Sequence, residues 1–122
     1  RHTRYSLQSR GLGDVYKRQG HYTIEACETS QFENHLRGVL DMPLGSPQLR
    51  APAAVMVNLL GTHRAAANPN APAALAVPGA HLHLYDKAEV RPGRKMGHVT
   101  VLAGDLEGAK RVARRAADEV GL

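Results

Sequence analysis

Aromatic side chains are scarce in this sequence, which has no tryptophan, one phenylalanine and four tyrosines. Proteins that bind single-stranded nucleic acids stack the bases on several aromatic rings, so this composition argues against that class. A single cysteine, Cys27, excludes an intramolecular disulfide framework and predicts a reducing, cytoplasmic location. No apolar run approaches the roughly 20 residues of a membrane-spanning helix, so we expect no membrane partner.

Several catalytic signatures are also missing. The sequence contains no glycine-rich phosphate loop, no dinucleotide-binding fingerprint and no Ser/His/Asp arrangement. Glu25 and Glu28 are candidate catalytic carboxylates. They lie just before a predicted helix, where acidic side chains are common because they interact favourably with the helix dipole. We therefore favour the second interpretation and predict no catalytic residue here.

The formal net charge of +5 would suit a nucleic-acid-binding protein, but the charge is unevenly distributed. Residues 1–19 carry five basic side chains and one acidic side chain, which gives +4. Residues 20–122 carry 11 basic and 10 acidic side chains, which gives +1. A nucleic-acid-binding domain that uses residues 1–19 and the last helix would show steeply salt-dependent binding. The near-neutral remainder does not support it, and we predict no nucleic-acid partner.

Residues 1–19 also lack hydrophobic periodicity, and glycines interrupt any pattern. The run GLGDVYKRQ at 11–19 resembles translated sequencing adapter, so we interpret this segment as a foreign leader, with a disordered basic arm as the alternative. The first methionine is Met42, and translation from it would remove a predicted helix. We therefore expect the natural N-terminus to lie upstream.

Residues 20–122 combine helix and strand patterns, which predicts the α+β class. Ser30-Gln31-Phe32-Glu33 is a capping box that begins a helix, and Pro43 and Gly45 follow its end. Strands are predicted at 54–60, 81–85 and 95–102, the last two as an antiparallel hairpin.

The remaining segments are a linker, an excursion and a final helix. Residues 46–53 are predicted to be a linker, and residues 61–77 a surface excursion with at most one helical turn. Asp105 is the predicted cap of the last helix. The apolar stripe of this helix comprises Leu106, Ala109, Val112, Ala113, Ala116 and Val120.

Four cations surround one predicted turn, Pro92-Gly93. They are Lys87, Arg91, Arg94 and Lys95. The planar fork of arginine and the compact charge of lysine both bind phosphate oxygens, so these residues are candidate ligands of a small phosphorylated metabolite. Pattern alone favours the alternative, a solvated hairpin tip.

Three histidines fall on two predicted neighbouring strands. His81 and His83 share one strand face, and His98 lies on the next strand. Three imidazoles can bind zinc, but no cysteine or acidic cluster accompanies them apart from Asp86. We therefore predict that they line a polar or interdomain face and that the chain has no metal site.

Three stretches of this sequence resemble one known family. They are GHYTIEACETSQFENHLRGVLDMPLG at 20–45, AVMVNLLG at 54–61 and PGAHLHLYDKAEVRPGRKMGHVTVLA at 78–103. Together they are similar to the C-terminal region of the 5-(carboxyamino)imidazole ribonucleotide synthases, which are ATP-grasp ligases of purine biosynthesis. The resemblance implies that residues 20–48 are the tail of an ATP-grasp domain. It also implies that residues 49–122 form a small β-rich domain with a terminal helix.

The family carboxylates 5-aminoimidazole ribonucleotide with bicarbonate, using ATP and Mg²⁺. The resemblance implies that Lys87 and Arg94 hold the 5′-phosphate of the ribonucleotide, with Arg91 and Lys95 as assisting neighbours. It implies that the catalytic, ATP-binding and magnesium residues lie upstream, so this chain alone is expected to be inactive. It further implies a cytoplasmic homodimer as the parent enzyme.

One departure from the family lies at the start of the resemblance. Members carry a Glu-x-Ala-Pro-Arg-x-His-Asn-Ser-Gly-His stretch, of which only Gly20 and His21 are present here. This abrupt loss supports the interpretation of residues 1–19 as foreign. The alternative function is a non-catalytic module that binds a phosphorylated nucleotide through the basic hairpin 87–95.

Overall fold

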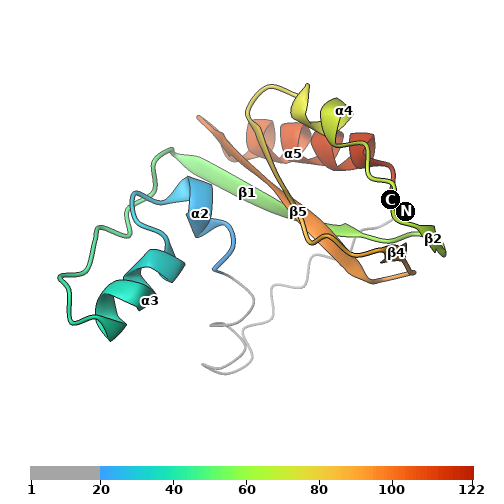
Figure 1. The fold of residues 1–122 in the computed structure, drawn as a ribbon. Coiled ribbons are helices and arrows are strands. Elements are labelled where there is room, and N and C mark those ends of the chain that lie inside the picture. Colours follow the sequence, from blue (N-terminus) through green and yellow to red (C-terminus); the bar gives the residue numbers. More distant parts are fainter. Residues whose placement is uncertain (1–19) are drawn as a thin grey trace.

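The structure is a computed structural model that describes residues 20–122 (Figure 1). The predictions made for residues 1–19, including the foreign leader, lie outside the described residues. Within residues 20–122 the fold mixes helices with antiparallel strands, which confirms the predicted α+β class. None of the helices in this part of the chain is both long enough and apolar enough to cross a membrane.

A three-stranded antiparallel sheet forms the centre of the fold (Figure 1). Its middle strand is β5 (Lys95–Ala103), flanked by β1 (Ala53–Leu60) and β3 (Ala80–Leu84). All three predicted strands are therefore confirmed, and the β3–β5 pairing confirms the predicted hairpin.

The two faces of this sheet differ in chemistry because side chains alternate along each strand. On one face, Val99 and Val101 of β5 lie opposite valines of β1 and residues of β3. On the other face, His98 lies opposite Asn58 of β1 and His83 of β3. The first face forms the core and the second is polar.

Two helices cover the apolar face (Figure 1). They are α5 (Leu106–Val120) and α4 (Ala71–Leu75). The buried core joins both helices to the sheet, and its members are Ala53, Leu59, Ala74, Val77, Val99, Val101, Ala109, Ala113, Ala116 and Val120. Alanines dominate the inner face of α5, which lets the helix lie close to the valines of the sheet.

The ends of α5 follow capping rules. The Asp105 carboxylate accepts a hydrogen bond from the Gly108 backbone N–H at 2.7 Å, which confirms the predicted N-cap. Gly121, with φ of 69°, ends the helix in the left-handed conformation. The predicted stripe is wrong at Leu106, which is 51% exposed because it lies in the first turn, beyond the edge of the core.

The segment 61–77 is more ordered than a surface excursion. β2 (Ala65–Ala66) pairs with β4 (Glu89–Val90), which lies between the strands predicted at 81–85 and 95–102, where no strand was predicted. Ala74 of α4 and Val77 are buried against α5. The prediction of a surface excursion is therefore wrong for these two residues, whereas the single predicted helical turn is present.

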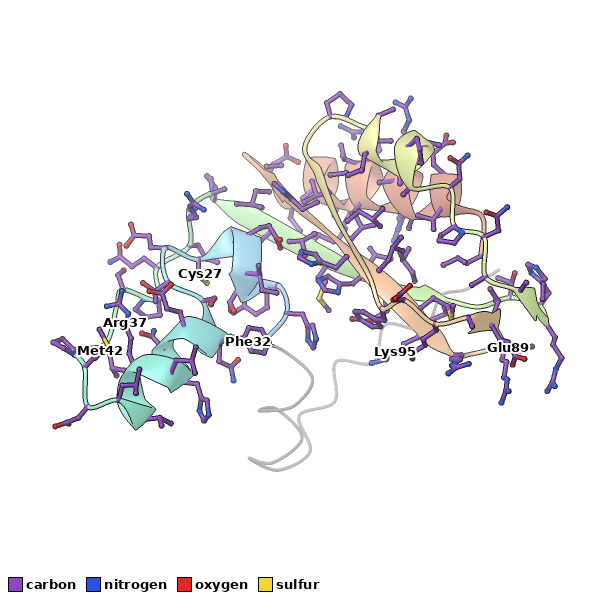
Figure 2. All side chains as sticks on the ribbon, in the orientation of Figure 1. Cys27, Phe32, Arg37, Met42, Glu89 and Lys95 are labelled. Carbon is purple, nitrogen blue, oxygen red and sulfur yellow. The ribbon has the colours of Figure 1, made fainter. Side chains whose placement is uncertain are left out.

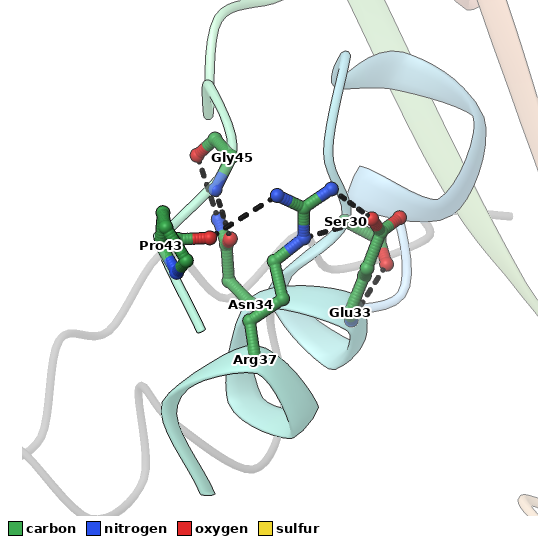
Figure 3. Close-up of polar contacts among 6 residues, drawn as sticks. All are labelled: Ser30, Glu33, Asn34, Arg37, Pro43 and Gly45. Atoms are coloured by element: carbon green, nitrogen blue, oxygen red, sulfur yellow. Dashed lines mark hydrogen bonds and ion pairs between the residues drawn. The ribbon is translucent and has the colours of Figure 1, made fainter. Parts of the chain in front are cut away.

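The N-terminal part of the described chain forms two helices on the polar side of the sheet. α2 (Thr23–Ala26) was not predicted, and it packs on β5. α3 (Gln31–Val39) begins as predicted, with the Ser30 hydroxyl accepting from the Glu33 N–H at 3.1 Å (Figure 3). The Glu33 carboxylate pairs with the Arg37 guanidinium one turn later, at 2.7 Å (Figure 3).

The chain after α3 folds back onto the helix through side-chain hydrogen bonds. The Asn34 carboxamide donates to the Gly45 carbonyl and accepts from the Gly45 N–H, at 3.1 and 2.8 Å (Figure 3). Arg37 donates to the carbonyl of Pro43 at 3.1 Å (Figure 3). These polar contacts stabilise the return of the chain, while the apolar side of α3 is exposed, with Leu36 at 61%.

Candidate functional site

The basic segment turns at Pro92-Gly93, as predicted. The Arg94 backbone N–H donates to the Arg91 carbonyl at 3.0 Å, which closes a four-residue turn. Gly93 has a φ of 74°, the value required at the third position of a type II turn, and proline suits the second position. The Pro92-Gly93 pair therefore favours the observed shape of the tip.

A glycine at the end of β1 anchors this tip. Gly61 follows β1, and its N–H donates to the Arg94 carbonyl at 2.9 Å. The Gly61 carbonyl accepts from the Gly93 N–H, also at 2.9 Å. A Cβ atom on Gly61 would collide with the carbonyl oxygen of Arg91 and with the buried side chain of Val90. Glycine is therefore required for the basic segment to lie against the end of β1.

Lys87 is the most constrained of the four predicted cations. It follows Asp86, whose φ of 49° redirects the chain after β3. The Lys87 ammonium donates to the Lys95 carbonyl at 2.6 Å and lies 5.7 Å from the centre of the Tyr85 ring. Both contacts fix the position of one positive charge beside the turn.

The two arginines share one acidic residue. The Arg91 guanidinium binds the Glu89 carboxylate through Nη2 at 2.6 Å and Nε at 3.0 Å. This hydrogen-bonded pair lowers the pKa of Glu89. Arg94 donates through Nη1 to the Glu89 backbone carbonyl at 3.3 Å. Sequence reasoning missed the role of Glu89. Its side chain can pair with Arg91, two positions later, because the backbone of β4 is extended and residues i and i+2 then lie on the same side.

Lys95 is exposed at the start of β5. Figure 2 shows Lys95 and Glu89 at the same end of the molecule, distant from Cys27 and Met42. The structure therefore brings the predicted ligands together in one loop region. Exposed ion pairs such as that of Arg91 and Glu89 contribute little stability, so a phosphate can compete for the guanidinium at small cost.

An open hollow lies next to this loop. Of the four candidate cations, only Lys87 lines it. Its other lining residues are Ala67, Pro69, Leu84, Asp86, Ala88, Met96 and Leu122. The lining combines apolar side chains with one cation and one carboxylate, those of Lys87 and Asp86.

A second cluster of polar residues lies on the polar face of the sheet. His98 is 1% exposed, and its ring stacks on His83 with 4.5 Å between the centroids. The His83 Nε2 atom lies 2.5 Å from a carboxylate oxygen of Glu25 in α2. The ring of His21 meets His98 edge-on at 5.2 Å. These contacts tie the segment before α2 to β3 and β5.

Burial sets the protonation of two members of this group, His98 and Tyr85. It lowers the pKa of His98 to about 4, with smaller contributions from His83 and His21 and an opposing one from Glu25. Burial also raises the pKa of the Tyr85 hydroxyl, which lies 2.9 Å from His98 Nδ1. At neutral pH, His98 is therefore an uncharged ring hydrogen-bonded to a protonated tyrosine.

Among residues 20–122, no group of three or more histidine, cysteine or acidic side chains is arranged to hold a metal ion. Of the three histidines considered for zinc, His83 and His98 lie together, whereas His81 is exposed and lies opposite Thr100. Glu25, weighed as a catalytic carboxylate, pairs with His83 instead.

The comparisons with known proteins agree on one family. Residues 54–112 match the phosphoribosylaminoimidazole carboxylase C-terminal domain. The N5-carboxyaminoimidazole ribonucleotide synthase of Synechococcus elongatus is 47% identical over 97 residues, which cover 78% of this chain and 24% of that protein. The chain carries the C-terminal domain of the N5-carboxyaminoimidazole ribonucleotide synthase family.

Other members of the family are similar at the level of sequence and structure. The phosphoribosylaminoimidazole carboxylase of Schizosaccharomyces pombe is 50% identical over 101 residues, covering 75% of this chain and 18% of that protein. The crystal structure of the Thermotoga maritima synthetase superposes with a TM-score of 0.72 at 52% identity. It covers 83% of this chain and 29% of that protein.

A second solved structure carries bound ligands. It is the Aspergillus clavatus synthase in complex with ADP and 5-aminoimidazole ribonucleotide, with a TM-score of 0.70 and 40% identity. The comparison covers 86% of this chain and 29% of the Aspergillus protein. The chain thus spans less than a third of the length of each of these family members.

Proposed function

We propose that this chain is the C-terminal part of an ATP-dependent ligase that carboxylates 5-aminoimidazole ribonucleotide with bicarbonate in purine biosynthesis. The observation that carries the proposal is the basic loop 87–95, which gathers four cations on a backbone fixed by Gly61 and the Pro92-Gly93 turn. The Aspergillus relative binds the same ribonucleotide, whose 5′-phosphate is an anion of the kind this loop suits.

Within this proposal, each cation has a different role. Lys87, held by Tyr85 and the Lys95 carbonyl, supplies a fixed point charge for the 5′-phosphate. Arg94 supplies a planar fork, since only one of its nitrogens is engaged with Glu89. Arg91 and Lys95 assist from the rim of the loop. The phosphate does not react, so these contacts serve binding and orientation of the substrate.

We further propose the division of the chain into two parts. Residues 20–48 are the tail of the ATP-grasp domain, and residues 49–122 are the small C-terminal domain. Two observations support this division: the family match at 54–112 falls inside the second part, and Glu25 of α2 pairs with His83 on the polar face of the sheet. The polar contacts of Glu25 and His21 would then lie at a domain boundary.

ATP, Mg²⁺ and bicarbonate are assigned to the complete enzyme, not to this segment. Family members have been crystallised with ATP or ADP, which supports the use of ATP. The described residues of this chain contain no cluster suited to a metal, so we place magnesium binding upstream. A homodimeric, cytoplasmic parent enzyme is part of the same proposal. Nothing in the relatives supports a free-standing nucleotide-binding module instead.

A chimeric enzyme tests this function. Residues 20–122 would replace the corresponding C-terminal part of the Thermotoga maritima synthetase, to which they are 52% identical. We expect ATP hydrolysis that requires both 5-aminoimidazole ribonucleotide and bicarbonate. The matched control carries Lys87→Ala and Arg94→Ala together. Ribonucleotide-independent activity, or equal activity in the control at low ribonucleotide concentration, would contradict the proposal.

A further inference from the structure

A series of contacts connects the buried polar face of the sheet with the basic loop. His98 Nδ1 lies 2.9 Å from the hydroxyl oxygen of Tyr85. The Tyr85 ring lies under the Lys87 ammonium, which is 5.7 Å from its centroid. The series therefore ends at a residue to which the proposed function gives a phosphate-binding role.

The identity of His98 is not explained by packing. His98 shares its face of β5 with the buried residues Met96 and Thr100, and a buried imidazole costs free energy unless its polar atoms are paired. In the described part of the chain, Nε2 of His98 is buried with no hydrogen-bond partner. The hydrogen bond to Tyr85 is thus the polar contact that offsets burial of this ring.

The surroundings of His98 hold the ring and its partner in one arrangement. His83 stacks on one side, at 4.5 Å and 11° between the planes, and is itself fixed by Glu25. His21 covers another side edge-on. Since His98 is uncharged at neutral pH and the Tyr85 hydroxyl is protonated, their hydrogen bond persists across the physiological range. The Tyr85 ring is consequently tethered at its hydroxyl end.

We propose that His98 and Tyr85 are positioning residues, which hold the Lys87 ammonium in place to receive a phosphate group. This inference rests on the proposed function of the basic loop. The negative face of a tethered ring attracts the ammonium from below, and the Lys95 carbonyl fixes it from the side at 2.6 Å. Without the tether the ring can turn, and the ammonium then loses one of its two contacts.

The test uses the whole 122-residue chain, with ¹³C-labelled lysine observed by NMR and inorganic phosphate as the probe. In the wild type, we expect the Lys87 side-chain signals to be displaced by the Tyr85 ring current and to shift further on phosphate addition. Tyr85→Phe keeps the ring but removes the tether, and His98→Gln removes it from the other side. Both should reduce the ring-current displacement and raise the phosphate Kd about threefold.

Two controls accompany these variants. His81→Gln changes an exposed histidine on the neighbouring strand and should alter neither quantity. Thermal melting identifies a variant that fails to fold, and Tyr85→Phe, which loses a single hydroxyl, carries the test if His98→Gln does not fold.

The outcomes separate this inference from the function on which it rests. If Tyr85→Phe leaves both the ring-current displacement and the phosphate Kd unchanged, the positioning role is overturned. If phosphate binds the wild type no better than it binds Lys87→Gln, the phosphate role of the loop fails. In that case the ring-current displacement still shows whether Tyr85 and His98 hold Lys87.

Discussion

Single residues of the basic loop differ in how the fold prepares them to bind an anion. Arg91 is paired with Glu89 through two hydrogen bonds, so it must leave a partner before it can bind phosphate. Arg94 donates one hydrogen bond to a backbone carbonyl, which leaves most of its donors available. Lys87 is half-buried with a fixed ammonium. These differences predict unequal effects of mutation.

Arg94→Ala is expected to raise the KM for the ribonucleotide roughly ten- to a hundredfold in the chimeric enzyme, because it removes a charge-assisted fork worth about 1.5–3 kcal/mol. The KM for ATP should change little, since the contact serves ribonucleotide binding alone. Arg94→Lys should recover part of the affinity, because a point charge cannot reproduce the fork. Lys87→Ala should have a similar but milder effect.

The control for this series is Arg111→Ala, which removes an exposed arginine on the outer side of α5. Steady-state kinetics with each substrate varied in turn provides the measurement. An unaltered ribonucleotide KM in Arg94→Ala would contradict the assignment of Arg94 to the phosphate site. It would not affect the assignment to the family.

His98 makes stability dependent on pH in a defined direction. Its pKa is lowered from 6.5 to about 4 in the folded chain, so between these values the unfolded chain binds more protons. Stability is therefore complete above about pH 6.5 and falls as the pH drops toward 4, by at most about 3 kcal/mol. The groups that face His98 are His83, His21, Glu25 and the Tyr85 hydroxyl.

Urea unfolding of the 122-residue chain at several pH values between 4 and 7 measures this effect. His98→Gln should be less stable than the wild type at pH 7 but should lose less stability on acidification. His81→Gln, which changes an exposed ring, should retain the wild-type slope. If the free energy of unfolding falls equally with pH in the wild type and in His98→Gln, a group other than His98 causes the pH dependence.

At the scale of elements, the loop is held by β1 as much as by its own turn. Gly61 exchanges two backbone hydrogen bonds with the loop and leaves no room for a Cβ. Gly61→Ala should therefore displace the loop and destabilise the chain by about 1–3 kcal/mol. Gly104→Ala is the matched control, because a Cβ there meets no atom within 4 Å.

The Gly61→Ala prediction is checked by thermal melting together with amide chemical shifts of residues 87–95. We expect large shifts in this range for Gly61→Ala and none for Gly104→Ala. A normal loop spectrum in Gly61→Ala would show that the backbone contact does not determine the position of the cations.

Buried and exposed leucines predict different losses of folding stability for the same substitution by alanine. Leu59 of β1 is 4% exposed in the core, whereas Leu36 of α3 is 61% exposed. Leu59→Ala should destabilise the isolated chain by about 2–5 kcal/mol, because it leaves a cavity. Leu36→Ala should change stability by less than about 0.5 kcal/mol. Urea unfolding of both variants gives the comparison, and equal costs would mean that α3 is covered in solution.

Element prediction from sequence succeeded where a signal was local. The capping residues Ser30 and Asp105, the Pro92-Gly93 turn and the alternation of 81–85 each depend on neighbours within a few positions. The central position of β5 and the short β2–β4 pair depend on partners far along the chain, which periodicity does not encode.

The same distinction applies to the candidate site. The four cations of the loop could be identified from composition and spacing. Their partners could not, because Glu89 and Tyr85 acquire their roles only when β4 and β3 set the directions of their side chains. The contact of Gly61 with Arg91 likewise joins residues separated by the whole of α4 and β3.

The whole molecule combines a self-contained core with a surface that lacks a partner among the described residues. α4, α5 and the sheet bury a contiguous set of apolar residues. The apolar residues of α3 and the chain after it are exposed, and they are Phe32, Leu36, Val39, Leu40, Met42 and Leu44. This contrast accompanies a chain that spans less than a third of the length of these relatives.

The chain of 122 residues is therefore expected to bind phosphate without turning over ATP. Phosphoryl transfer requires groups that neutralise and align the triphosphate, and metal ions that bridge its oxygens. The described residues offer one cationic loop and no metal cluster, and the loop is assigned to the unreactive end of the ribonucleotide. Purified chain supplied with ATP, Mg²⁺, bicarbonate and 5-aminoimidazole ribonucleotide should release no phosphate above the background of a protein-free sample. Bicarbonate-dependent release from the chain alone would place the catalytic groups within these residues and overturn the assignment of ATP binding to the upstream part.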